Sequence, residues 1–511
     1  MMRSTKTFFL TVLGMVALTL ASCNKNTSGT TGWKYNDAEY GGFQVVDGYQ
    51  QQTPPGMVFI PGGTFTMGRV TEDIFSEWNN YPRRVSVNNF YMDQYEISNR
   101  DWKEYVYWMG LMYGGEVAEK CRPDSTVWRE ELAYNEPYLN YYFTHTAYDM
   151  YPVVGISWEQ ATDYCTWRSD RVNERILVEE GVIDFPDFEA ISQDSTKAGN
   201  DSIAKDMVFN TGKYLTVSDY NPDREKSSMK DAFGNVRKTN MNDGLLMPNF
   251  RLPTEAEWEF AAYGIQSASE METYENRRIY PWDGSQMRNP NRKGRGKMMA
   301  NFARGRGDMM GVAGDANDNA TITAPVNSFW PNDFGLYNMA GNVNEWVMDV
   351  YRQLSSEEFE EYNPFRGNIY KSPVRDSSGV YQLDSLGRLD MAVEYSKTDS
   401  LAAYVKLDVR NYGDGDAASS YDQNQWKAVV DPDAATKKLY DADEPTDPES
   451  MLSSKISNTT RVYKGGGWKD RAYWLSPSTR RYLEQTEKRN DIGFRCAMDC
   501  VGSDKGNNPK N

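Results

Sequence analysis

The chain has 511 residues, with 56 Lys and Arg against 73 Asp and Glu, which gives a formal net charge of −17. This acidic balance argues against nucleic-acid binding, because contacts with phosphates need clustered basic side chains. His145 is the only histidine in the sequence, so metal centres built on two or three histidines are excluded. A hydrophobic content of 39% and an aromatic content of 13% indicate a folded protein with a large core.

The first residues have the pattern of an export signal, in which Arg3 and Lys6 precede an apolar run too short to span a bilayer. The run ends in Leu-Ala-Ser-Cys at Cys23, which resembles the lipobox of bacterial lipoproteins. We predict that residues 1–22 are removed and that Cys23 is acylated, with an ordinary cleaved signal as the alternative. Asn24 after the cysteine resembles lipoproteins that are forwarded to the outer membrane, so the predicted location is its periplasmic face.

The chain after the anchor begins with a polar segment. Residues 23–55 are rich in Asn, Thr, Ser, Gly and Gln, which predicts a lipidated, flexible tether. A globular pattern follows directly. Residues 57–68 are typical of two short strands around a glycine turn, and residues 85–97 are typical of another strand pair.

Three helices are predicted from their start signals. Ser98 is a plausible N-cap for a helix over residues 99–109, and Ser157 caps the start of a second helix. Thr254 and Glu257 form a capping box, which predicts the start of a third helix.

Two polar stretches, residues 171–248 and 351–460, interrupt this pattern and show little periodicity. We interpret them as large surface insertions in one domain over residues 56–500, followed by a polar tail at 501–511. A basic, glycine-spaced stretch over residues 288–306 stands out on the acidic chain. It could dock an acidic partner or lipid headgroups, but we favour a solvated loop.

Several sequence blocks occur in one order along the chain, at residues 62–68, 152–167, 251–262, 334–346 and 461–468, with 493–497 closing the series. Together they resemble the formylglycine-generating enzyme (sulfatase-modifying factor) family. The resemblance implies an α+β fold related to C-type lectins, with much irregular backbone. The many Gly and Trp residues fit such a fold, because glycine allows close backbone approach and aromatic side chains fill an irregular core.

The chemistry of that family requires two cysteines five residues apart, which bind copper and attack the substrate thiol. The resemblance places Asp470 and Leu475 at these two positions. Neither side chain can hold Cu(I), which selects sulfur ligands. We therefore predict no catalytic residue, no enzyme activity and no copper. The single histidine predicts no iron cofactor, and the lack of a CxxC motif or Cys/His cluster predicts no zinc.

The chain has five cysteines, and four remain if Cys23 carries lipid. The sequence alone allows three pairings among these four. The family resemblance implies a disulfide between Cys165 and Cys496, which leaves Cys121 and Cys500 as a candidate second pair, with free buried thiols as the alternative.

The same resemblance implies two calcium sites made of oxygen ligands. The first consists of the side chains of Asn301 and Asp318 with the carbonyl groups of Phe302 and Ala320, and the second contains Asn342 and Glu345. Turn formation by these Asn and Asp side chains is the alternative. Calcium is thus the one cofactor that the sequence suggests.

A finer resemblance concerns residues 31–44 and 73–80, which, with the lipobox, look like the GldJ-type lipoproteins of gliding motility and type IX secretion in Bacteroidota. It implies a non-catalytic outer-membrane lipoprotein that acts as a scaffold or assembly factor. Its partners would be other envelope proteins of these systems, such as GldK- and GldN-like proteins. Two alternatives stay open: an envelope lipoprotein that binds glycan or peptidoglycan, and a divergent enzyme of the sulfatase-modifying type.

Overall fold

The computed structural model describes residues 27–46, 49, 51–76, 80–131, 133–189, 208–217, 229–264, 273–275, 277–282, 284–305, 318, 320–352, 364–367, 371–393 and 459–502. The predicted signal, Cys23 and most of the second predicted insertion and of the polar tail lie outside the described residues. Within the described ranges, no helix has the length and apolar character that a membrane crossing would need.

Three helices begin where the capping signals predict them: α2 (Asn99–Tyr113), α5 (Trp158–Glu179) and α9 (Glu255–Tyr263). Each starts with a full capping box, formed by Ser98 with Asp101, Ser157 with Gln160, and Thr254 with Glu257. These boxes satisfy N–H groups that a helix start leaves unpaired. α5 continues to residue 179, so the predicted start of the first insertion at residue 171 falls inside a packed helix.

The shorter helices are α3 (Gly115–Cys121), α4 (Glu136–Tyr141) and α8 (Thr211–Thr216). Short 3-10 turns occur at η1 (Ala38–Tyr40), η2 (Ser125–Trp128), η3 (Thr146–Tyr148), η4 (Met241–Asp243) and η6 (Ala472–Leu475).

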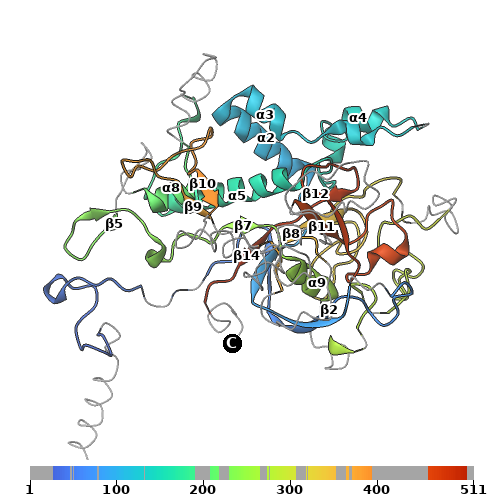
Figure 1. The fold of residues 1–511 in the computed structure, drawn as a ribbon, viewed down its shortest axis with the longest axis horizontal. Helices are drawn as coiled ribbons and strands as arrows, with labels where there is room; N and C mark the ends of the chain where they lie inside the picture. Colours follow the sequence, from blue (N-terminus) through green and yellow to red (C-terminus); the bar gives the residue numbers. More distant parts are fainter. Residues whose placement is uncertain are drawn as a thin grey trace, which may run out of the picture.

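Two four-stranded sheets form the centre of the molecule, and each joins distant parts of the chain (Figure 1). The first has the order β1 (Met57–Ile60), β4 (Phe90–Asp93), β14 (Ala497–Asp499) and β7 (Phe250–Arg251), and all of its pairs are antiparallel. The second has the order β12 (Arg481–Glu484), β11 (Thr460–Lys464), β8 (Asn344–Val350) and β13 (Ile492–Gly493), with β13 parallel to β8.

Three strand pairs lie outside these sheets. They are β2 (Gly63–Met67) with β3 (Arg83–Val87), β5 (Met229–Lys230) with β6 (Val236–Arg237), and β9 (Lys371–Pro373) with β10 (Met391–Val393). The predicted strands around residues 57–68 and 85–97 therefore exist. However, β1 and β2 pair with β4 and β3 rather than with each other.

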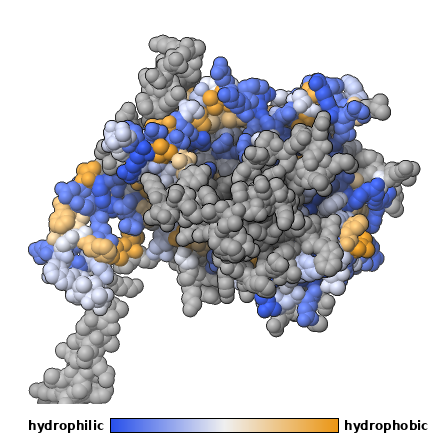
Figure 2. All heavy atoms as spheres, in the orientation of Figure 1, coloured by the Kyte–Doolittle hydropathy of each residue, from blue (hydrophilic) through white to orange (hydrophobic). Residues whose placement is uncertain are grey.

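Helices cover the sheets from opposite sides (Figure 1). α5 packs on β7, while α9 packs against β2, β3 and β8. The side chains of Trp102, Trp258 and Trp346 are fully buried between these layers. Trp102 stacks on Tyr164 with ring centroids 5.3 Å apart, and such aromatic pairs stabilise the core beyond the area they bury. The described surface on the face in Figure 2 is mainly hydrophilic, with apolar side chains in separate small patches.

A set of charged side chains, here called the buried ionic core, joins α9 to the end of β11 and to the residue before β12. It consists of Lys464, Glu255, Glu259 and Arg480. The Lys464 Nζ atom lies 2.8 Å from Glu259 Oε2 and 3.3 Å from Glu255 Oε1, and its side chain is 0% exposed. Arg480 Nε lies 2.6 Å from Glu255 Oε1. Each buried charge therefore has an opposite charge in direct contact, as a dry interior demands.

The mixture of helices and sheets confirms the predicted α+β class. The likeness to C-type lectins and the extents of the two insertions stay predictions.

Candidate functional site

Asp470 follows a glycine-rich turn after β11. Gly465 and Gly466 have φ values of 99° and 69°, a backbone conformation that glycine adopts without strain. A Cβ atom on Gly466 would lie 2.8 Å from the carbonyl oxygen of Trp474, so this turn also needs glycine for space. The turn brings the Asp470 carboxylate over the start of β8 and beside β12.

The Asp470 carboxylate is held by donors on all sides. Arg481 NH1 donates to Oδ1 at 2.7 Å and Arg481 NH2 donates to Oδ2 at 2.6 Å, which makes a bidentate ion pair. The Gly467 N–H and the Asn344 side chain donate to Oδ2 at 2.7 and 3.1 Å. Burial alone would raise the pKa of Asp470, but the hydrogen bonds and charge of Arg481 lower it below its usual value. The group is therefore an ionised carboxylate that is fixed in place.

Leu475, the other residue at a predicted cysteine position, ends η6 and is fully buried. It packs in a cluster with Tyr280, Phe302 and Ala340. Its side chain fills space and carries no group that could bind a metal.

A small hollow of about 280 Å³ lies beside this loop. Its lining includes Asn301, Trp468 and Lys469, and the Lys469 ammonium pairs with the Glu130 carboxylate. Ala320, Thr321 and Ile322 line this hollow and also a larger one of about 810 Å³, here called the groove.

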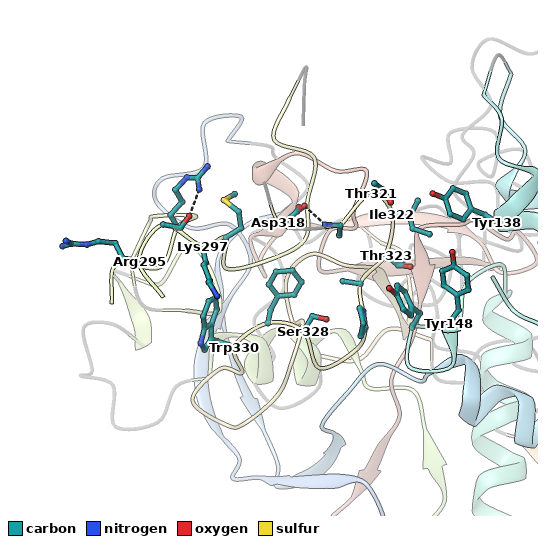
Figure 3. A pocket seen from close by; sticks show the side chains of 18 residues that line it. Tyr138, Tyr148, Arg295, Lys297, Asp318, Thr321, Ile322, Thr323, Ser328 and Trp330 are labelled. Carbon is teal, nitrogen blue, oxygen red and sulfur yellow. Dashed lines mark hydrogen bonds between the residues drawn. The ribbon is translucent and has the colours of Figure 1, made fainter. Parts of the chain in front are cut away.

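Two walls of different chemistry face the groove (Figure 3). The tyrosine wall consists of Tyr138, Tyr148 and Tyr151. The cationic rim consists of Arg288, Arg295 and Lys297, with Trp330 next to it. Thr321, Ile322 and Thr323 lie between the two walls, and Asp318 lies near the middle (Figure 3).

The tyrosine wall is anchored from behind by Tyr142. The hydroxyl of this buried residue donates to the Pro152 carbonyl at 2.6 Å and lies 2.8 Å from the Thr323 hydroxyl. Tyr148 and Tyr151 pack edge to face with centroids 5.1 Å apart. Burial, together with Tyr138 and Tyr151, raises the pKa of Tyr148, so this residue is neutral at physiological pH and offers a hydroxyl donor.

The residues of the first predicted calcium site lie together. The two Asp318 oxygens accept hydrogen bonds from the backbone N–H groups of Phe302 and Ala320, each at 3.2 Å. The Asn301 side chain donates to the Ile322 carbonyl at 2.8 Å. The Asp318 carboxylate and the Asn301 side chain thus lie close to the backbone of Phe302 and Ala320, and calcium binding there stays a prediction.

The residues of the second predicted calcium site do not fit calcium. Glu345 accepts hydrogen bonds from Arg495 NH2 at 2.6 Å and from the Trp258 indole at 2.7 Å. The Asn342 side chain donates to Glu96 at 2.7 Å and accepts from the Ala324 N–H at 2.7 Å. A carboxylate that is neutralised by a guanidinium has no net charge left for a cation.

Glu96 is a buried carboxyl that the sequence did not single out. Asn338 and Asn342 donate to its Oε2 at 2.9 and 2.7 Å. Burial, followed by the nearby Glu345 carboxylate, raises the pKa of Glu96 to about 8. Glu96 is therefore largely protonated at neutral pH.

The cysteine side chains divide into one close pair and two separate residues. The buried Cys165 and Cys496 sulfur atoms lie 3.5 Å apart and are not bonded, so the predicted partners are neighbours and the disulfide stays a prediction. Cys121 donates to the Tyr105 hydroxyl at 3.4 Å, whereas Cys500 lies beside the Tyr91 hydroxyl. Cys121 and Cys500 thus contact different side chains, and the second disulfide stays a prediction.

The groove was not predicted from the sequence. The basic stretch and the tyrosines of residues 138–151 lie far apart in the chain, and no sequence pattern connects them. The density of tyrosine in that segment was the available signal, because six tyrosines lie between residues 134 and 151. Arg481, which binds Asp470, carried no signal beyond being one of many arginines.

The sequence motifs agree with a comparison to known protein families. The family model for the sulfatase-modifying factor enzyme 1-like domain (FGE-sulfatase) matches residues 42–385, more than half of the chain. The chain belongs to this family, as predicted. It is 28% identical to the formylglycine-generating enzyme of Mus musculus over 309 residues, which cover 60% of this chain and 61% of that enzyme. The match thus spans about three fifths of that relative.

Two further relatives are named as an inactive enzyme and as a chaperone protein. The inactive C-alpha-formylglycine-generating enzyme 2 of Bos taurus is 23% identical, over 59% of this chain and 73% of that protein. The chaperone protein LppX of Paenibacillus barcinonensis is also 23% identical, over 59% of this chain and 74% of that protein. Among solved structures, PvdO from Pseudomonas aeruginosa aligns with a TM-score of 0.38 at 14% identity, covering 89% of this chain and 98% of that one. The family thus includes members named as inactive.

Proposed function

We propose that this protein is a non-catalytic, GldJ-type outer-membrane lipoprotein that acts as a scaffold or assembly factor in type IX secretion and, in gliding species, in gliding motility. The observation that carries the non-catalytic part is the ion pair of Asp470 with Arg481. It stands where the family resemblance expects a copper-binding thiolate.

The contacts of Asp470 argue against any oxidase-like use of this position. A copper oxidase needs a soft sulfur ligand that can change its bonding, and a carboxylate oxygen cannot replace it. Asp470 accepts hydrogen bonds from Arg481, Gly467 and Asn344, so it is also not free to act as a base. Leu475 has no reactive atom at all.

The relatives support the same reading in a general way. One of them is named as inactive and another as a chaperone protein, so the domain has uses other than oxidation. A rigid domain with large polar segments offers surface for docking, and the fold by itself does not specify chemistry.

The remaining parts of the proposal concern place and partners. We place the protein on the periplasmic face of the outer membrane, anchored through acylated Cys23. Its partners are other envelope proteins of the same machinery, with GldK- and GldN-like proteins as the first candidates. These parts rest on the lipobox and on residues 31–44 and 73–80.

A biochemical test addresses the missing chemistry. The purified full chain should bind no stoichiometric Cu(I) in competition with a chromogenic chelator, and it should not consume oxygen with a thiol peptide. An active formylglycine-generating enzyme, assayed in parallel, is the positive control. Copper held at one equivalent, or turnover of the peptide, would revive the enzyme alternative.

A genetic test addresses the biological role. In a deletion strain, the wild-type gene should restore secretion of cargo that carries the C-terminal type IX signal. Cys23→Ala should not restore it and should move the protein into the soluble fraction, whereas Asp470→Asn should restore it at matched protein levels. Normal secretion in the deletion strain would contradict the proposed role, and unchanged fractionation of Cys23→Ala would contradict the anchor.

We also propose calcium at the first predicted site only, held by Asn301, Asp318 and neighbouring carbonyl groups. Titration calorimetry with CaCl₂ should detect one site in the wild type and none in Asp318→Asn. Glu345→Gln is not a suitable control, because Glu345 neutralises a buried arginine. Asp333→Asn, at an exposed ion pair with Arg278, should leave calcium binding unchanged.

A further inference from the structure

We propose that the groove between the tyrosine wall and the cationic rim binds an acidic peptide segment of a partner protein. The proposal requires the groove alone, and it holds whichever envelope machinery the protein serves. It rests on the charge of the rim, the rigidity of the loop that carries it, and the hydrogen-bond donors opposite.

The rim is a cluster of unpaired cations on an acidic protein. The chain has a net charge of −17, yet Arg288, Arg295 and Lys297 form no ion pair with any residue that the structure describes. Arg295 and Lys297 are exposed, and among the described residues the side chain of Arg288 has one hydrogen bond, to the Gly296 carbonyl at 2.5 Å. Exposed cations cost little by themselves, and a docking carboxylate would bring the opposite charges together in a partly enclosed space.

The loop that carries the rim is held in shape by its own backbone. The Asn289 N–H donates to the Lys297 carbonyl at 2.8 Å, and the Gly296 N–H donates to the Asn289 carbonyl at 3.1 Å. A Cβ atom on Gly294 would lie 3.1 Å from the Trp330 ring, so the loop packs closely on that side chain. The backbone from which the cations project is therefore already ordered, so a ligand need not order the loop itself, which lowers the entropy cost of binding.

The opposite wall adds hydroxyl donors. The hydroxyl groups of Tyr138, Tyr148 and Tyr151 can donate to carboxylates and to peptide carbonyls. Asp318 is the acidic residue in the groove lining, and both of its oxygens already accept backbone N–H groups. Among the described residues, the groove lining thus holds one carboxylate and three cations, which favours an anionic ligand.

The enclosed shape of the groove favours a peptide over a lipid surface. Basic residues that attract membranes form open patches next to the bilayer, whereas these lie in a hollow of about 810 Å³. Within the described part of the chain, the backbone N–H groups of Thr321 and Thr323 have no hydrogen-bond acceptor. Main-chain groups of a bound peptide could pair with the exposed Thr321, as in other peptide-binding sites.

The test is fluorescence anisotropy of a labelled oligo-glutamate peptide with the full chain in detergent, at low and at physiological salt. The wild type should bind at low salt and more weakly as salt rises. The double variant Arg295→Glu with Lys297→Glu should weaken binding by about tenfold or more. Tyr148→Phe, which removes one hydroxyl, should weaken binding by about threefold.

The matched control is Arg292→Glu with Lys293→Glu. These two exposed cations lie on the same loop but do not line the groove, and the change in charge is identical. This variant should keep most of the affinity. Equal losses in the two double variants would show mere charge attraction and overturn the proposal.

Three other outcomes would also overturn it. One is no binding of the peptide at low salt by a folded wild-type protein, as judged by circular dichroism. Another is tighter binding of a polygalacturonate oligosaccharide than of the peptide, which would assign the groove to acidic glycans. The third is rim-dependent binding to vesicles that contain phosphatidylglycerol without binding of the peptide.

Discussion

The buried ionic core and the cationic rim use the same residue types in opposite ways. In the core, Lys464 is completely buried and contacts two carboxylates, whereas Lys297 on the rim is exposed and has no ion-pair partner among the described residues. Removing a charge from water costs several kcal/mol, so a buried cation survives only with partners that belong to the fold. A cation on the rim keeps its hydration and is available to a ligand. Burial and pairing, more than residue type, therefore separate structural charges from candidate binding charges in this protein.

The largest expected effect comes from removing the central cation of the buried ionic core. Lys464→Met leaves Glu255 and Glu259 with less positive charge in a dry environment, and the free energy of unfolding should fall by about 3–5 kcal/mol. Urea unfolding followed by circular dichroism measures this change.

The matched variant on the rim is Lys297→Met. It removes a cation of the same kind from the surface, and the free energy of unfolding should change by less than about 0.5 kcal/mol. Similar losses in the two variants would break the comparison between the two regions.

An intermediate effect is expected at Asp470, whose ion pair lies between the core and the surface. Asp470→Asn keeps the shape but weakens the pairing with Arg481, at a cost of about 1–3 kcal/mol at neutral pH. Because the pKa of Asp470 is lowered, its contribution is complete above the ordinary value of 3.8 and is lost as the pH falls through the folded-state pKa.

The free energies of unfolding of the wild type and of Asp470→Asn, measured across the acid range, test this ionisation. The difference between the two free energies should disappear at low pH. Asp499→Asn is the control, because its partner Arg251 also pairs with Glu257. A constant gap at all pH values would contradict the assigned ionisation.

The smallest expected effect is the contribution of Glu96 to the dependence of the free energy of unfolding on pH. Its pKa is raised to about 8 from an ordinary value of 4.5, so between these values the folded state holds a proton that the unfolded state has released. This group therefore contributes stability that is complete below pH 4.5 and is lost as the pH rises through 8, with a slope of at most about 1.4 kcal/mol per pH unit.

Glu96→Gln should remove this slope while leaving stability at pH 5 nearly unchanged. Asp349, whose pKa burial and the nearby Glu255 raise to about 7, gives a slope of the same sign in both proteins. Only the difference between the wild type and Glu96→Gln is therefore informative, and identical slopes would show that Glu96 is ionised in the folded state.

Local signals predicted local structure well. Each capping box lies within four residues of sequence, and Ser98, Ser157 and Thr254 begin helices as predicted. The family blocks predicted the neighbourhood of Cys165 and Cys496, although residues 331 positions apart must meet there.

The groove and the ion pairs could not be predicted in this way. The tyrosine wall comes from residues 138–151 and the rim from residues 288–297, and no periodic pattern links two loops that only the tertiary fold brings together. Likewise, nothing in the sequence distinguishes Arg481 from Arg295. Only their surroundings show that one neutralises Asp470 and that the other faces open space.

The positions of the final strands have a consequence for how the polypeptide is made. β14 lies between β4 and β7, and β11 lies between β12 and β8, so both sheets are completed by residues after 459. A nascent chain leaving the ribosome keeps open edges on β4 and β8 until the residues after 459 have been translated. A premature stop codon before residue 459 should therefore yield a species that proteases remove, and a shortened working domain is not expected.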